Sequence, residues 1–133
     1  MTNHDSPTTG TLEHINLTVS DPEQTAAMLV DLFDWHVRWK GGSIHDGQSI
    51  HVGSNTSYLA LYATGQPADD PVDSYRHLAG LNHIAVVVDD LDTLEQRVEA
   101  AGFKPTNHAD YEPGRRFYFR DHDNIEFEIV SYA

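Results

Sequence analysis

Two histidines occupy equivalent places in two similar segments of this sequence. His14 is the third residue of segment 12–19, and His83 is the third residue of segment 81–88, about half the chain further on. Both segments have the apolar, β-branched composition of strands, and an acidic helix start follows each. Because imidazole is a common ligand of transition metals, a repeat with a histidine at one fixed position favours a metal site shared by two modules.

A carboxylate in the last predicted strand could complete this site. In segment 125–132 apolar residues alternate with Glu126 and Glu128, so the two glutamates share one face while the apolar face packs on a helix. Two imidazoles and one carboxylate suit Fe(II), Mn(II), Zn(II) or Ni(II) and leave coordination positions open to a substrate. Each residue alone is as readily explained as a solvent-facing polar group, and the repeat is what favours the metal.

The elements that must position these residues follow one order in each half: strand, helix, strand, strand, strand. In the first half a helix is predicted from Asp21 to about Phe33, with Gly41-Gly42 and Asp46-Gly47 interrupting strands 35–40, 49–52 and 58–63. In the second half a helix starting at Asp89-Asp90 is predicted to stop at Gly102, with strands at 81–88, 104–107, 115–120 and 125–132. These elements predict a loose tail at 1–10, module one at 11–63, a linker at 64–80 and module two at 81–132, with cavity loops at 41–49, 64–80 and 107–114.

Composition excludes several classes of protein. The 133 residues include 21 acidic and 8 basic ones, a formal charge of −13, which repels phosphate backbones and anionic lipid and so predicts no nucleic acid or membrane partner. There is no cysteine, which excludes disulfides and thiolate ligands. No apolar stretch is long enough to span a bilayer, and we expect a cytoplasmic protein.

The segments around His14 and His83, together with segment 117–129, resemble the vicinal oxygen chelate superfamily. This superfamily includes glyoxalase I, extradiol dioxygenases, methylmalonyl-CoA epimerase, fosfomycin resistance enzymes and bleomycin-binding proteins. The resemblance implies an α+β fold in which paired βαβββ modules form an open, curved mixed sheet around one divalent metal. It also implies Glu128 as the ligand, because Asn124 takes the place of the glycine that precedes the family's glutamate by four residues; Glu126 is the alternative.

One departure from the family bears on mechanism. Matching strand 58–62 to the last strand places Ala60 where glyoxalase I has a second glutamate. Alanine binds no metal and moves no proton, so the remaining set of two histidines and one glutamate is more similar to that of the extradiol dioxygenases, whose chains usually have four modules.

Other side chains are candidates for lining the cavity. His51 could act as an acid or base because its ordinary pKa is near neutral, and Tyr118 resembles a tyrosine that assists dioxygenases. Tyr58, Tyr62 and Arg116 are candidates for binding substrate. Aromatic packing or exposure to solvent is the competing interpretation of each.

These observations predict a metal-dependent enzyme acting on a small oxygen-rich substrate, and a homodimer. The reaction would be that of a glyoxalase-like lyase or isomerase, then of a ring-cleaving dioxygenase, then of an epimerase. The alternative is a binding or resistance protein that holds a drug or metabolite without turnover.

Overall fold

The computed structural model describes residues 8–66, 68–111 and 114–133. The chain consists of two compact units, Met1–Gln66 and Pro67–Ala133. Among the described residues each unit contains one α-helix and one open four-stranded mixed sheet, which confirms the predicted α+β fold of paired βαβββ modules. None of the helices among the described residues is long and apolar enough to cross a bilayer.

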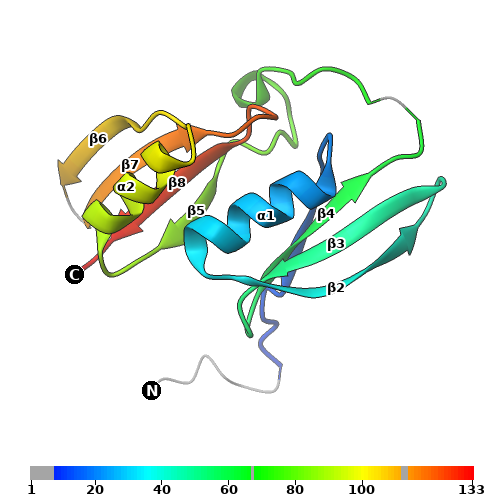
Figure 1. Ribbon diagram of the computed structural model, residues 1–133, viewed down its shortest axis with the longest axis horizontal. Helices are drawn as coiled ribbons and strands as arrows, with labels where there is room; N and C mark the ends of the chain where they lie inside the picture. Colours follow the sequence, from blue (N-terminus) through cyan, green and yellow to red (C-terminus); the bar gives the residue numbers. More distant parts are fainter. Residues whose placement is uncertain (1–7, 67, 112–113) are drawn as a thin grey trace. The chain divides into compact units, whose positions relative to one another are not determined.

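In the first half, one helix covers one face of a four-stranded sheet (Figure 1). The strand order is β1-β4-β3-β2, with β1 parallel to β4 and the other neighbours antiparallel. The helix begins where Asp21 accepts hydrogen bonds from the backbone N–H groups of Glu23 and Gln24, and it ends at Asp34 in the left-handed conformation. The elements are β1 His14–Thr18, α1 Pro22–Phe33, β2 His36–Ser43, β3 Gly47–Gly53 and β4 Tyr58–Ala63.

The core of this half lies between α1 and the sheet. Leu29 and Leu32 on the helix are fully buried, and Ile50 and Leu61 on the strands are at most 2% exposed. Burying each of these side chains contributes about 1.5–3 kcal/mol. Since side chains alternate along a strand, this packing turns His51 to the sheet face that the helix does not cover.

The second half repeats the arrangement of one helix on one sheet (Figure 1). Its core contains more aromatic side chains than that of the first half. The strand order is β5-β8-β7-β6, again with the first pair parallel. Phe119 and Phe127 stack with ring centres 5.2 Å apart, and both are about 1% exposed. The elements are β5 Ile84–Val87, α2 Leu91–Ala100, β6 Thr106–Tyr111, β7 Gly114–Arg120 and β8 Glu126–Ser131.

A tight turn sets the start of β8. One carboxylate oxygen of Asp121 accepts the backbone N–H groups of Asp123 and Ile125, each at 2.9 Å. Burial raises the pKa of Asp121, although these two hydrogen bonds oppose the shift. Asn124 adopts φ 64°, the left-handed conformation expected at the position of the family's glycine.

Three sequence predictions about elements were wrong. Strand β2 continues through Gly41 and Gly42, because ladder pairing with β3 uses only the backbone. Segment 107–111, predicted as loop, belongs to β6: pairing with β7 overrides the low strand propensity of its Asn and Asp residues. Strand 81–88 is shorter than predicted, because its partner β8 begins at Glu126, so His83 lies just before β5. Parts of the predicted tail, linker and third loop (1–7, 67 and 112–113) lie outside the described residues.

Candidate metal centre

His83 and Glu128 meet on the second sheet, on the face opposite α2. His83 Nε2 lies 3.1 Å from Glu128 Oε1, and Glu128 is only 7% exposed. Arg116 Nη1 donates to the other carboxylate oxygen of Glu128 at 2.8 Å, and its guanidinium lies over the ring of Tyr111. The Arg116 hydrogen bond therefore holds Oε2 and leaves Oε1 turned toward the imidazole.

Two tyrosines surround His83. Tyr118 lies edge-on to the imidazole with ring centres 5.8 Å apart. Burial raises the pKa of Tyr118, and the electrostatic interaction with Glu128 raises it further. The Tyr75 hydroxyl donates to Glu126 Oε1 at 2.7 Å and lies 3.2 Å from His83 Nδ1. The hydrogen bond to Glu126, helped by burial, raises the pKa of Tyr75 to about 12, so this phenol keeps its proton at neutral pH.

In the first half His14 belongs to a cluster of rings. Its Nδ1 lies 2.9 Å from Glu13 Oε1, which also accepts from the Tyr58 hydroxyl at 3.4 Å. The hydrogen bond from His14 lowers the pKa of Glu13. His14 stacks on Tyr58 at 4.8 Å, and His51 stacks on Tyr58 at 4.7 Å.

Two further side chains extend this cluster. Trp39 packs against His51 with ring centres 5.0 Å apart, and the guanidinium of Arg38 lies 4.5 Å from the centre of the Tyr58 ring. Burial lowers the pKa of His51, and electrostatic interactions with His14 and Arg38 lower it further. His51 is therefore a neutral imidazole near pH 7, the form that can accept a proton.

The sheet registers show which positions of the two halves are equivalent. In the first, the residue two after His14 pairs with Ala60; in the second, the residue two after His83 pairs with Glu128. Ala60 thus occupies the place of Glu128, as the sequence match predicts. On the adjacent antiparallel strand, His51 lies directly opposite Ala60 in the first half, and Tyr118 lies directly opposite Glu128 in the second.

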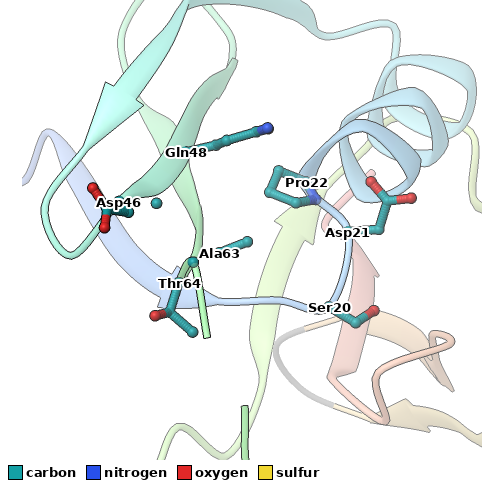
Figure 2. A pocket seen from close by; sticks show the side chains of 9 residues that line it. Ser20, Asp21, Pro22, Asp46, Gln48, Ala63 and Thr64 are labelled. Carbon is teal, nitrogen blue, oxygen red and sulfur yellow. The ribbon is translucent and has the colours of Figure 1, made fainter. Parts of the chain in front are cut away.

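Tyr62 and a polar pocket of the first half lie outside these two groups of side chains. The Tyr62 hydroxyl donates to the backbone carbonyl of Ile44 at 2.9 Å, which gives it a structural role. A polar pocket of about 270 Å³ opens between the start of α1 and the ends of the β2–β3 turn and β4 (Figure 2). Its walls include Asp21 and Asp46 but none of the predicted site residues.

The structure thus brings the predicted residues together within each half. His14, His51 and Tyr58 form one group, and His83, Arg116, Tyr118 and Glu128 form the other. Sequence reasoning missed Glu13 and Tyr75, the partners of the two Nδ1 atoms. Glu13 directly precedes a predicted ligand, which was a usable signal; Tyr75 lies in a predicted linker, where no periodicity marks it.

The donor set of the second half fits a divalent metal. Two ligands at about 2.1 Å and at right angles around one ion are about 3 Å apart, and His83 Nε2 and Glu128 Oε1 are separated by 3.1 Å. Within the described residues no group of three or more histidines and carboxylates is positioned to hold an ion. The second half by itself supplies two possible ligand atoms for a metal, His83 Nε2 and Glu128 Oε1.

The Glyoxalase/Bleomycin resistance protein/Dioxygenase superfamily profile matches residues 11–129 of the sequence. The chain belongs to this superfamily. The match spans both halves, including both histidines and Glu128. No curated protein sequence gave a significant match.

Solved structures of the superfamily have the same fold. A glyoxylase/bleomycin resistance protein/dioxygenase domain from Frankia sp. EAN1pec is 26% identical, with a TM-score of 0.79 over 92% of this chain and 97% of that one. The fosfomycin resistance protein FosX from Listeria monocytogenes, complexed with Mn(II) and sulfate, is 22% identical, with a TM-score of 0.68 over 91% of each chain. TioX from Micromonospora sp. ML1 is 19% identical, with a TM-score of 0.67 over 93% of this chain and all of that one.

Proposed function

We propose that this chain is a divalent-metal-dependent enzyme that acts on a small oxygen-rich substrate, with His14, His83 and Glu128 as the metal ligands. The observation that carries the proposal is the His83–Glu128 pair. The two atoms that would bind the metal, His83 Nε2 and Glu128 Oε1, are 3.1 Å apart, and Glu128 is largely buried. A metal-bound relative of the same fold, FosX with Mn(II), supports it.

The contacts of both histidine Nδ1 atoms support the same three metal ligands. His14 Nδ1 is held by Glu13 and His83 Nδ1 by Tyr75. Ligating histidines commonly engage their second ring nitrogen in this way, which fixes the ring and leaves Nε2 for the metal. His14 would supply the third ligand, from the same chain or from a second copy in the proposed homodimer.

The side chains around the donors have distinct parts in this proposal. A bound metal would act as a Lewis acid on adjacent substrate oxygens. Neutral His51 would accept the substrate proton, in place of the carboxylate that Ala60 lacks. Tyr118 and Arg116 would hydrogen-bond to substrate oxygens beside Glu128, and the ring of Tyr58 would form part of the wall.

This arrangement favours a lyase or isomerase that moves one proton, ahead of a ring-cleaving dioxygenase and an epimerase. The reason is that His51, the proposed base, lies directly opposite Ala60 on the neighbouring strand. A homodimer in the cytoplasm is part of the proposal, and sedimentation of the purified protein tests its oligomeric part.

Elemental analysis tests the proposal. Freshly purified wild-type protein should contain one Fe, Mn, Zn or Ni per chain, and His14→Ala, His83→Ala and Glu128→Ala should each lose most of it. His108→Ala is the matched control, because His108 pairs with Glu95 at 2.9 Å outside the proposed set. Full metal content in both His83→Ala and Glu128→Ala would refute the site.

A second candidate function is binding of an aromatic drug or metabolite without turnover. It is favoured by the Arg116–Glu128 ion pair, which already neutralises this carboxylate, and by the stacked rings of His14, Tyr58 and His51. Tight binding of a planar ligand by metal-free protein, with no conversion of that ligand after metal is added, would favour this function.

A further inference from the structure

A bulge in β2, the edge strand of the first sheet, places two neighbouring side chains on one face (Figure 1). Val37 pairs with Val52 of β3. The next pair is Trp39 with His51, so Arg38 between them is one residue more than the ladder requires. In a regular strand Arg38 and Trp39 would point to opposite faces, whereas a bulge changes the direction of the side chain that follows it. Trp39 therefore lies on the face of His51, which α1 does not cover.

Both side chains contact the cluster of rings around Tyr58. The Trp39 indole packs against His51 with ring centres 5.0 Å apart, and the Arg38 guanidinium lies 4.5 Å from the centre of the Tyr58 ring. Lys40, the next residue along, reaches the opposite face, where its ammonium pairs with a glutamate of α1 at 3.2 Å. The bulge thus adds one cation and one indole to a face that already holds stacked aromatic rings.

The indole of Trp39 lies over a glycine. Gly41 is two residues further along β2 and so lies on the same face as Trp39. A Cβ atom at Gly41 would stand 2.8 Å from Cζ2 and 2.9 Å from Cη2 of the indole, so the six-membered ring of Trp39 covers this glycine. The side chain of Trp39 is nonetheless 49% exposed. The indole is therefore held between Gly41 and His51, with a large part of its ring system open to solvent.

The charge of Arg38 is not paired with a carboxylate. Its Nη1 donates to the neutral backbone carbonyl of Ser54 at 3.3 Å, and it forms no ion pair within the part of the chain that the structure describes. Glu13, whose pKa is lowered first by the hydrogen bond from His14 and last by Arg38, accepts from the Tyr58 hydroxyl instead. Three arginines of the second half do pair with carboxylates: Arg115, Arg116 and Arg120.

An arginine in this state is suited to bind an anion. A guanidinium that lies on an aromatic ring keeps N–H groups free at its edge, and their planar fork matches a carboxylate. The whole chain carries a formal charge of −13, so Arg38 is a local positive charge on a molecule that otherwise repels anions. The exposed indole beside it offers a flat surface on which an aromatic ring can stack.

We propose that Trp39 and Arg38 bind the substrate, and that this substrate is a small aromatic carboxylate. Its ring would stack on the indole, and its carboxylate would bind the guanidinium. A ring in this place lies beside His51, the proposed base, so the binding surface is continuous with the proposed reaction centre. The term substrate rests on the proposed function, whereas binding of an aromatic carboxylate is a property of the metal-free protein.

Titration of metal-free protein with benzoate, followed by nitrogen–proton NMR of the indole groups, tests the proposal. The chain has two tryptophans, and Trp35, which packs against Phe33, is the internal control. Benzoate should shift the Trp39 signal and leave the Trp35 signal unchanged. Benzamide lacks the charge and cyclohexanecarboxylate lacks the aromatic ring, so each should bind at least about fivefold more weakly. An unchanged Trp39 signal, or equal affinity for benzoate and either analogue, would overturn the proposal.

Two matched pairs of variants test the residues themselves. Arg38→Gln should weaken benzoate binding about tenfold, and Lys40→Gln, which removes a charge from the other face of the same strand, should not. Gly41→Ala should displace the indole and weaken binding about threefold or more, whereas a Cβ at Gly42 would meet no atom within 4 Å, so Gly42→Ala should leave binding unchanged. Equal affinities within either pair would contradict the proposal, and melting temperatures confirm that all four variants are folded.

Metal content separates the failure of this proposal from the failure of the proposed function. If the purified protein held no metal, the enzyme would fall, and the benzoate titration would still decide whether Trp39 and Arg38 bind an aromatic carboxylate. If metal were bound and benzoate left the Trp39 signal unchanged, the enzyme would stand and this substrate class would fall. A Trp39 signal that shifted with protein concentration instead of benzoate would assign the indole to contact with a second copy of the chain, which would also overturn the proposal.

Discussion

The two halves of the chain share a fold but differ in what stands beside the equivalent histidines. Beside His83 there is a buried carboxylate paired with an arginine; beside His14 there are rings, and Ala60 occupies the carboxylate's position. The β-sheet register is nearly the same in both, so the difference comes from side chains alone. A duplicated scaffold can thus keep one histidine position in each half while the side chains beside that histidine change.

This difference between the halves predicts that the carboxylate ligand of the metal and the base that accepts the substrate proton come from different halves of the chain. In the proposal the second half supplies the charged ligand of the cation through Glu128, and the first half accepts the substrate proton through His51. The pKa of His51, lowered by burial, suits that part, because a neutral imidazole is available near pH 7.

The largest effect on stability should come from the aromatic core below the second site. Phe127→Ala removes a ring stacked on Phe119 and should lower the free energy of unfolding by about 3–5 kcal/mol. Leu59→Ala, at the equivalent place in the first half, should cost less, toward about 2 kcal/mol. Urea denaturation of both variants measures the difference, and a greater loss in Leu59→Ala would contradict it.

The largest effect on metal binding should come from Glu128→Gln. Loss of the charged donor should weaken Mn(II) or Zn(II) binding at least about 100-fold, which is about 2.7 kcal/mol. Glu95→Gln is the matched control, since it alters an exposed glutamate–histidine pair elsewhere in the same half. Calorimetric titration that gives equal affinities for the two variants would refute Glu128 as a ligand.

Making the halves more alike should have a smaller effect. Ala60→Glu adds a carboxylate at the position equivalent to Glu128 and should tighten metal binding about tenfold if His14 lies in the coordination sphere. Ala60→Gln has the same size without the charge and controls for overpacking, since Ala60 is 1% exposed. Indistinguishable affinities in these two variants would show that this position does not face the metal.

The smallest effect should be the pH dependence contributed by His51. Its pKa in the folded protein is lowered from 6.5, so the unfolded chain takes up a proton first as the pH falls. The stabilising contribution is therefore complete above pH 6.5 and decreases as the pH drops through and below that value. Melting temperatures between pH 7.5 and 5.5 should decrease less in His51→Gln than in wild type, and an equal decrease in both would contradict this contribution.

The sequence predicts much of this fold because the repeat and the strand alternation are local signals. The caps at Asp21 and Asp90 and the alternation around Glu128 locate helices and faces without any knowledge of pairing. Strand β6 was missed because its stability comes from pairing with β7, which the polar residues of 107–111 do not reveal.

The candidate site was predictable only in its main residues. His14, His83 and Glu128 stand out by repetition and by motif, whereas the contact of Tyr75 with His83 depends on a turn in a segment without periodicity. Likewise, Arg116 and Glu128 are neighbours because β7 and β8 pair in one particular register.

The central claim is that histidines from both halves bind one ion, and pulsed electron paramagnetic resonance of Mn(II)-loaded protein tests it most directly. With ¹⁵N-labelled histidine, the wild type should show two coupled imidazole nitrogens, and His14→Ala and His83→Ala should each show one. Coupling to a single nitrogen in wild type, or a spectrum that His14→Ala leaves unchanged, would contradict the account.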